Sequence, residues 1–183
     1  GPGTPPAELA ERYTRVLKGH LALAATRFPE GVAGPHLDAV ARLPLWQAGL
    51  DYDHGTGHGI GSFLSVHEGP AAFSRLAKPV PLRAGMILSD EPGFYAPGAY
   101  GIRIENLLLV RPAEQRPGQV RPFLEFETLT LAPYDRMLIQ VGLLTPDERR
   151  VVDAYHARVL AEIGPLLPAG DAAWLTRACA PVM

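Results

Sequence analysis

Cysteine is almost missing from this chain of 183 residues, since Cys179 is the single one, and an internal disulfide is therefore excluded. A chain without disulfides suits a reducing compartment. No apolar run approaches the ~20 residues that a membrane-spanning helix needs. The N-terminus also lacks the charged and then apolar pattern of a signal peptide. We therefore expect a cytoplasmic protein with no membrane partner.

The chain also has no large excess of either acidic or basic residues. The chain has 17 basic and 19 acidic residues, a net charge of -2, and no basic block, so we expect no nucleic-acid partner. Apolar residues make up 47% of the chain and charged residues 20%, as in ordinary globular proteins. The 19 glycines and 19 prolines indicate many loops but no low-complexity segment. The length suits one domain with a small extension.

Hydrophobic periodicity predicts helices near both ends of the chain. Apolar residues recur at helical spacing over residues 9–24 and 151–163. The second of these helices is preceded by Thr145-Pro-Asp-Glu148, a pattern typical of a capping box with proline at the first helical position. We also expect a helix over residues 37–49, interrupted at its proline, and a last short helix over residues 172–179.

Three stretches are typical of β-strands. Residues 86–92 form a short apolar run that ends in an acidic pair, residues 101–110 are the most strand-like of the chain, and residues 123–131 alternate. The intervening segments contain glycine and proline, and we expect them to be loops or turns; these segments are 71–84, 93–101 and 111–122.

Glycine occupies every second position in the segment His54-Gly-Thr-Gly-His-Gly-Ile-Gly61. Extended backbone would place the side chains on one face and leave the other face bare. Glycine here forfeits packing and backbone entropy, so we expect another group to approach closely. With His67, three of the six histidines fall within fourteen residues. This clustering favours a functional site over a mobile loop. His20 lies apart from the cluster, beside a helical apolar stripe, and we expect it to be a satisfied core histidine or a surface histidine.

Charged residues also occur within the predicted strands. Arg103 and Glu105 would point the same way along a strand flanked by apolar residues, so we expect both to be buried. A buried charge must be paired or must bind a metal, because desolvating it alone is costly. An Arg–Glu ion pair and a metal site both satisfy that requirement. Glu91 ends another apolar strand, and by itself it is equally an ordinary turn residue.

Spacing limits what the histidines can do together. His54 and His58 would stand ~13 Å apart in an extended chain, too far to share one ion, and the alternating glycines disfavour a helix. One imidazole with at least two carboxylates makes an oxygen-rich site suited to Mn, Co, Fe or Zn. Two bridging carboxylates would hold two ions about 3.5–4 Å apart, and such a pair activates a shared water for hydrolysis.

Three blocks follow one another along the chain: residues 54–70 with the histidines, Asp90-Glu-Pro-Gly-Phe-Tyr95, and Gly101-Ile-Arg-Ile-Glu-Asn106. Together they resemble Xaa-Pro aminopeptidase (aminopeptidase P), a family of pita-bread metallopeptidases. The likeness extends to Tyr13–His20, to residues 45–52 and to the segment from Phe123 onward, so it covers nearly the whole chain.

The resemblance implies an α+β fold. We expect half of a pita-bread (creatinase/aminopeptidase-like) domain, with a curved, mainly antiparallel sheet backed by helices. Residues 1–112 would be the C-terminal half of the pita-bread catalytic domain. Residues 113–183 would be the final sheet strand and the helical extension of aminopeptidase P.

The same resemblance implies three metal ligands, which are His58, Glu91 and Glu105. Glu91 would also serve as general base and proton shuttle. His54 and His67 would contact the substrate and stabilise the tetrahedral intermediate, and Arg103 would hold the carboxylates in place. The implied cofactors are two divalent ions, with manganese favoured and zinc or cobalt as alternatives.

The implied reaction releases the N-terminal residue from peptides that have proline in second position. A metal-bridging hydroxide would attack the carbonyl of the scissile bond while the metal polarises its oxygen. Two alternative interpretations of the function stay open. One is a non-catalytic pita-bread module that binds a peptide or protein, and the other is a related enzyme, an Xaa-Pro dipeptidase or a methionine aminopeptidase.

The family's site needs two further aspartate ligands that this sequence does not match. Asp38, Asp51 and Asp53 precede the histidine block, but none lies in a similar context. We therefore expect three of five ligands, a missing N-terminal half of the catalytic domain as partner, and a chain that is inactive alone. A homodimer is a further expectation for the intact enzyme.

Overall fold

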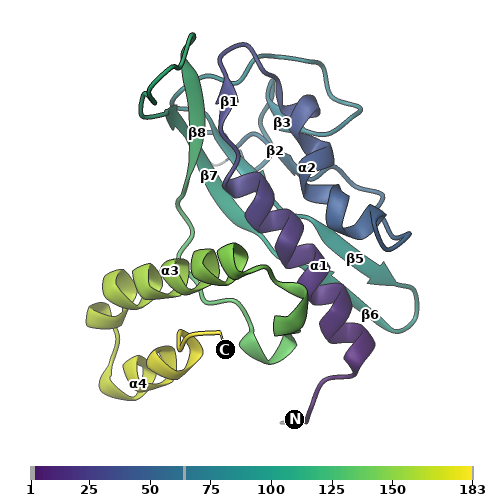
Figure 1. Ribbon diagram of the computed structural model, residues 1–183, viewed down its shortest axis with the longest axis vertical. Helices are drawn as coiled ribbons and strands as arrows, with labels where there is room; N and C mark the ends of the chain where they lie inside the picture. The colour runs from purple at the N-terminus through teal and green to yellow at the C-terminus, as the bar shows by residue number, and fades with distance from the viewer. Residues whose placement is uncertain (1–2, 64, 183) are drawn as a thin grey trace. The chain divides into compact units, whose positions relative to one another are not determined.

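The computed structural model of the protein describes residues 3–63 and 65–182. Leu64, within the resembled histidine block, and the outermost ends of the two predicted domains lie outside the described residues. The chain forms two compact units, Val16–Thr130 and the combination of Gly1–Arg15 with Leu131–Met183 (Figure 1). The domain boundary expected at residues 112/113 stays a prediction. Among the described residues, no helix combines the length and the apolar character needed to cross a membrane.

An antiparallel sheet is the frame of the larger unit. Its four strands lie in the order β1-β8-β7-β4, and their bounds are Phe28–Pro29, Phe123–Thr128, Asn106–Pro112 and Ile87–Asp90. Two antiparallel strand pairs accompany the sheet: β2 (Gly57–His58) with β3 (Ala72–Phe73), and β5 (Gly93–Ala96) with β6 (Tyr100–Arg103). The strands predicted near residues 86–92 and 123–131 are confirmed as β4 and β8.

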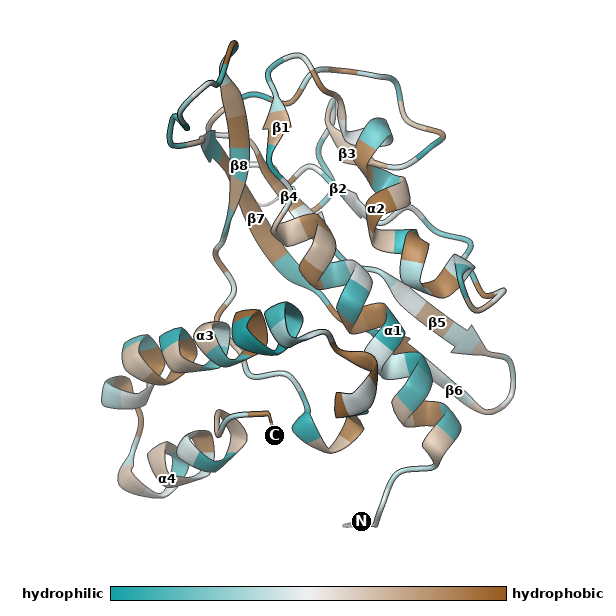
Figure 2. Cartoon of the chain, in the orientation of Figure 1, coloured by the Kyte–Doolittle hydropathy of each residue, from teal (hydrophilic) through white to brown (hydrophobic). Residues whose placement is uncertain are grey.

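Two helices cover the sheet within this unit: α2 (Gly34–Trp46) and the part of α1 (Ala7–Ala24) that begins at Val16. Their apolar residues pack against those of β4, β7 and β8, which appear brown in Figure 2. The fully buried members of this core include Leu23, Leu88 and Leu108. Each such side chain stabilises the fold by roughly 1.5–3 kcal/mol relative to exposure. The predicted arrangement of helices backing an antiparallel sheet is thereby confirmed.

The two helices approach closely at a glycine. A Cβ atom on Gly19 of α1 would lie 1.9 Å from the carbonyl oxygen of Ala41 on α2. Only a residue without a side chain allows this contact. The crossing therefore fixes the position of α2 against α1, and with it the side chains that α2 directs toward the rest of the unit.

The predicted break in the second helix and the predicted loop over residues 93–101 are wrong. Helix α2 is not interrupted at Pro44 but continues to Trp46, because a proline this close to the helix end removes a single helical hydrogen bond. The predicted loop over residues 93–101 is instead the β5–β6 hairpin, which turns at Gly98 with a positive φ of 73°. A glycine adopts that conformation without strain.

The smaller unit contains α3 (Pro146–Ile163), α4 (Ala169–Ala178) and short 3-10 turns at Arg136–Leu138, Val141–Leu143 and Gly164–Leu166. The capping box predicted for α3 is confirmed: Glu148 N–H donates to Thr145 Oγ1, and Thr145 N–H donates to Glu148. Val159, Leu175 and Cys179 form the buried core between α3 and α4.

A buried histidine lies in the smaller unit. His156 is fully buried beside the rings of Tyr134 and Tyr155, and its Nε2 accepts the Tyr134 N–H at 3.0 Å. Its Nδ1 has no hydrogen-bond partner among the described residues. Burial lowers the pKa of His156 below its ordinary value of 6.5, and Arg136 lowers it further, while Asp153 opposes the shift.

This environment predicts that the smaller unit loses stability in acid. The folded unit holds His156 neutral to a lower pH than the unfolded chain, which binds a proton as the pH falls through 6.5. The contribution is therefore present above pH 6.5 and is lost as the pH falls from 6.5 toward the lowered pKa of the folded unit, with a slope of at most about 1.4 kcal/mol per pH unit. Urea unfolding between pH 7.5 and 5, followed by Trp174 fluorescence in a Trp46→Phe background, measures this slope. His156→Gln, which keeps an acceptor, should flatten it, and an unchanged slope would refute the assignment.

Candidate functional site

The bare face of the histidine segment is packed against other backbone. A Cβ atom on Gly57 would lie 1.8 Å from Ser89 O on β4, and one on Gly59 would lie 2.1 Å from Glu68 O. Ile60 N–H also donates to Ile87 O, which extends the pairing with β4. The expected close approach to the alternating glycines is therefore confirmed. The approaching group is the protein's own main chain, and it brings His58 beside the end of β4.

His58 is held in one orientation. Its backbone N–H donates to Ser89 Oγ at 2.9 Å, and its Nδ1 lies 2.9 Å from Gly59 O, to which it donates. Because Nδ1 carries a hydrogen, the neutral ring has its lone pair on Nε2. That atom lies 3.2 Å from Glu91 Oε1.

Both carboxylate oxygens of Glu91 are held by neighbours. Glu91 is 7% exposed, directly after β4. Ser89 Oγ donates to its Oε1 at 2.8 Å, and Arg103 Nη1 donates to its Oε2 at 2.9 Å. Its backbone N–H donates to Thr56 O at 2.7 Å. The carboxylate is therefore fixed with one oxygen directed at His58, as a ligand or a proton acceptor requires.

A chain of hydrogen bonds links Arg103 to His54. Arg103 Nε donates to the hydroxyl oxygen of Tyr95 at 2.9 Å, and that hydroxyl lies 2.8 Å from His54 Nε2. His54 Nδ1 lies 2.8 Å from Gly55 O. The consistent assignment has Nδ1–H donating to the carbonyl and the tyrosine hydroxyl donating to Nε2. The structure thus joins two predicted site residues through a tyrosine.

The prediction that Arg103 and Glu105 are buried is wrong. Both residues are exposed, and the predicted strand 101–110 is two strands, β6 and β7, separated by Ile104 and Glu105. The break occurs because β6 pairs with β5 whereas β7 pairs with β4 and β8. Arg103 consequently forms its ion pair with Glu91.

The structure brings the predicted ligands together only in part. His58 and Glu91 are in contact, and the His67 ring lies 4.1 Å from the His58 ring, centroid to centroid. Glu105 is not grouped with them: the described residues contain no cluster of three His, Cys, Asp or Glu side chains arranged for a metal ion. The roles assigned to these residues stay predictions.

Buried polar residues support the strand ends that carry the two glutamates. His20, fully buried, has its Nδ1 3.2 Å from Asp90 Oδ2 and its Nε2 3.1 Å from Asn106 Nδ2. Asp90 and Asn106 are register partners on β4 and β7, and they adjoin Glu91 and Glu105 in sequence. Burial raises the pKa of Asp90, and His20 opposes the rise. The expectation that His20 is a core histidine is confirmed.

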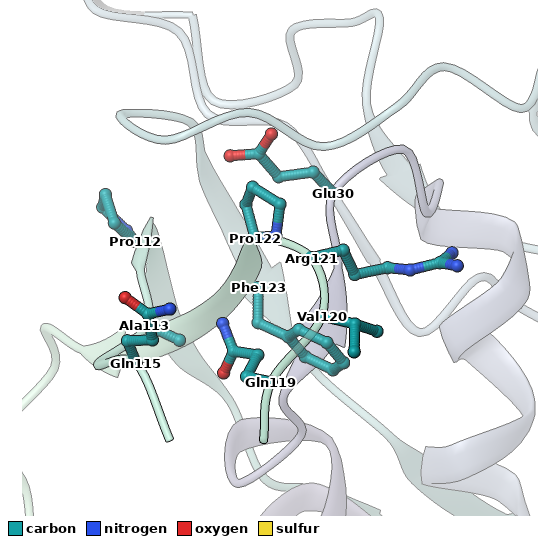
Figure 3. A pocket seen from close by; sticks show the side chains of 9 residues that line it. All are labelled: Glu30, Pro112, Ala113, Gln115, Gln119, Val120, Arg121, Pro122 and Phe123. Carbon is teal, nitrogen blue, oxygen red and sulfur yellow. The ribbon is translucent and has the colours of Figure 1, made fainter. Parts of the chain in front are cut away.

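Sequence reasoning missed two residues of this site. Ser89 is on β4 and lies two positions before Glu91, which follows the strand, so strand periodicity could have placed both side chains on one face. Tyr95 carried no such signal, because its contact with His54 depends on the β5–β6 hairpin. A pocket of about 390 Å³ elsewhere in the unit, lined by Glu30, Gln119 and Phe123 among others, contains none of the predicted site residues (Figure 3).

Comparison with known proteins agrees with this geometry. Residues 1–112 match the model of metallopeptidase family M24, and residues 122–182 match the C-terminal region of peptidase M24. The chain therefore belongs to metallopeptidase family M24. Within that family it is similar to aminopeptidases P: it is 48% identical to aminopeptidase P1 of Lotus japonicus over 98% of this chain, and 46% identical to Xaa-Pro aminopeptidase 1 of Dictyostelium discoideum over 90%. The resemblance noted in the sequence is confirmed.

Solved structures show the same relationship. The X-prolyl aminopeptidase of Caenorhabditis elegans, a cytosolic enzyme with a di-nuclear active site, superposes with a TM-score of 0.92 and 42% identity over 97% of this chain. Prolidase from Pyrococcus furiosus gives a TM-score of 0.53 and 33% identity over 58% of this chain. The expected pita-bread fold is confirmed. The chain spans 28% of the Lotus relative and 29% of the C. elegans chain.

The contact at Gly57 yields a stability prediction. Gly57→Ala places a methyl group 1.8 Å from a backbone oxygen that cannot rotate away, so we expect a loss of about 3 kcal/mol, at the upper end of overpacking effects. Gly142→Ala is the matched control, because nothing lies within 4 Å of its added Cβ. Urea unfolding midpoints measure both. Equal midpoints for the two variants would show that the strand is not held by this contact.

Proposed function

We propose that these residues supply part of the active site of an Xaa-Pro aminopeptidase, a hydrolase that releases the N-terminal residue from peptides with proline in second position. The observation that carries the proposal is the facing pair of His58 Nε2 and Glu91 Oε1, 3.2 Å apart and each fixed by further hydrogen bonds. The 42–48% identity to aminopeptidases P supports the substrate class.

The donor set suits a divalent cation. With Nδ1–H of His58 donating to Gly59 O, the lone pair of Nε2 and the carboxylate oxygen of Glu91 face one another, and a cation or proton between them satisfies both. Glu105 is exposed next to β7, and exposed side chains change rotamer within nanoseconds, so it is available as a third ligand. Two divalent ions, with manganese favoured and zinc or cobalt as alternatives, would lower the pKa of a shared water and polarise the scissile carbonyl.

The chain's own residues have distinct roles in this proposal. Glu91, steadied by Ser89 and Arg103, accepts a proton from the attacking water and delivers it to the leaving amine. His54 and His67 contact the substrate and stabilise the tetrahedral intermediate. Arg103 holds Glu91 Oε2 and, through Tyr95, the position of the His54 ring.

The site is completed, in this proposal, by sequence outside the 183 residues. The described residues group no three ligands, and the C. elegans relative with a di-nuclear site is more than three times as long as this chain, which covers 29% of it. The N-terminal half of the catalytic domain is the expected partner, and the 183 residues alone are inactive. The cytosolic relative supports a cytoplasmic location.

A related dipeptidase is the second candidate, because prolidase from Pyrococcus furiosus shares part of the fold. That likeness covers 58% of this chain, whereas the likeness to X-prolyl aminopeptidase covers 97%. Residues 122–182 also match the C-terminal region of peptidase M24. The extension therefore favours aminopeptidase P over prolidase.

The metal role predicts weak, His58-dependent binding. Calorimetric titration of Mn²⁺ into the 183-residue chain should show weak binding that His58→Ala abolishes, because the imidazole is one of few ligands present. His36→Ala, which alters an exposed histidine on α2, should leave the isotherm unchanged. Tight binding of two ions would refute the incompleteness of the site, and binding that survives His58→Ala would refute its role as ligand.

The catalytic role of Glu91 is tested with residues 1–183 joined to the N-terminal half of the catalytic domain. Cleavage of a tripeptide with proline second should exceed cleavage of the Xaa-Pro dipeptide. Glu91→Gln should lower kcat by at least about 100-fold, as loss of a general base does. Glu125→Gln, at a carboxylate paired with Arg111, is the control. Preference for the dipeptide would favour the prolidase alternative.

A further inference from the structure

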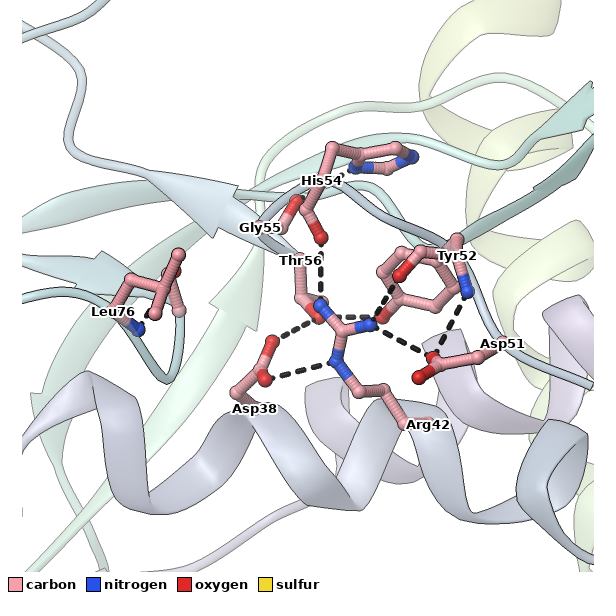
Figure 4. A network of polar contacts seen from close by, with 9 residues as sticks. Asp38, Arg42, Asp51, Tyr52, His54, Gly55, Thr56 and Leu76 are labelled. Atoms are coloured by element: carbon pink, nitrogen blue, oxygen red, sulfur yellow. Dashed lines mark hydrogen bonds and ion pairs between the residues drawn. The ribbon is translucent and has the colours of Figure 1, made fainter.

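A buried guanidinium lies between helix α2 and the segment that leads to the histidine strand (Figure 4). Arg42 is 2% exposed. Its Nε donates to Asp38 Oδ2 at 2.8 Å, and its Nη1 donates to Asp51 Oδ1 at 2.8 Å. A buried cation needs such partners. Two carboxylates would be enough to satisfy that need if Arg42 only joined α2 to the core.

Two further hydrogen bonds of Arg42 end on backbone carbonyls of the segment before the histidine strand. Nη1 donates to Tyr52 O at 2.7 Å, and Nη2 donates to His54 O at 2.6 Å. The Tyr52 ring lies 4.0 Å from the guanidinium carbon, in a cation–π contact. One rigid, planar group therefore fixes alternate carbonyls of the same segment.

The network continues into the strand through Asp38. Its Oδ1 accepts the Thr56 hydroxyl at 2.6 Å, while its Oδ2 pairs with Arg42. The carbonyl of Thr56 accepts the Glu91 N–H at 2.7 Å. The contacts that begin at Arg42 thus reach the backbone of both His54 and Glu91.

The residues next to His54 in the sequence cannot fix the orientation of its ring by themselves. The ring donates from Nδ1 to Gly55 O at 2.8 Å and accepts the Tyr95 hydroxyl at Nε2, so its orientation depends on the Gly55 carbonyl as well as on Tyr95. Glycine imposes little preference on that backbone. The hydrogen bond from Arg42 to His54 O holds the peptide immediately before Gly55, and it restricts the freedom that the glycine would otherwise give.

We propose that Arg42 is a positioning residue, whose guanidinium fixes the backbone of residues 52–56 and thereby the orientation of the His54 imidazole. The inference rests on the proposed function, which gives His54 its contact with the substrate. Lysine cannot replace Arg42 in this role, because an ammonium is a point charge without the planar fork that reaches Asp38 and both carbonyls together.

The test observes the His54 ring directly, without metal or peptide. Long-range ¹H–¹⁵N NMR spectra of the histidines in the 183-residue chain, with His54 assigned by His54→Gln, report its tautomer. The wild-type chain should show one tautomer with the proton on Nδ1. Arg42→Lys should lose that single-tautomer pattern. A wild-type His54 that samples both tautomers would overturn the proposal before any variant is made.

Two variants separate positioning from stability. Arg111→Lys alters an exposed arginine that pairs with Glu125 across β7 and β8, and it should leave His54 unchanged. Asp51→Asn removes a charge beside Arg42 but keeps both carbonyl contacts, and it should also leave His54 unchanged. The proposal would be overturned if the Arg42→Lys chain folds with lower stability but shows an unaltered His54 spectrum. In that case Arg42 would only hold α2 against the rest of the unit.

The outcome is independent of the metal titration. If Mn²⁺ binding does not depend on His58 but Arg42→Lys releases the His54 ring, the proposed function fails and the positioning role stands. If Mn²⁺ binding depends on His58 while His54 is unaffected by Arg42→Lys, the proposed function stands and the positioning role fails.

Discussion

The contact between bare backbone at Gly57 and the carbonyl of Ser89 is the constraint on which the site depends. Any side chain at position 57 would separate the histidine strand from β4. At this distance the His58 N–H reaches Ser89 Oγ, and the same hydroxyl reaches Glu91. One serine therefore aligns an imidazole and a carboxylate that are far apart in the sequence, and the alternating glycines are a packing requirement of that alignment.

Two buried polar groups hold the strands that meet at this contact. His20 on α1 touches Asp90 and Asn106 at the ends of β4 and β7. Arg42 on α2 holds the segment that enters the histidine strand. The helices themselves cross at Gly19, where their backbones touch. The same pair of helices thus positions both sides of the site. The geometry of His58 and Glu91 therefore depends on the packing of the whole unit.

Local signals in the sequence predicted much of this structure. The capping box at Thr145 located the start of α3, and the glycine alternation located a strand that another backbone approaches. The burial of Arg103 was misjudged, because alternation over residues 101–110 cannot reveal that β6 and β7 pair with different strands. Contacts such as that of His54 with Tyr95 join residues 41 positions apart, and only tertiary pairing determines them. The roles of the site residues came from family resemblance and remain predictions.

The most direct test of this account is the position of a bound ion. A crystal of the chain equilibrated with saturating Mn²⁺ should give an anomalous difference peak within coordination distance of His58 Nε2 and a carboxylate oxygen of Glu91, since these atoms face one another across 3.2 Å. Glu105 should turn toward the same peak. A peak bound elsewhere, or none between His58 and Glu91 at saturation, would contradict the claim that this pair is a metal site.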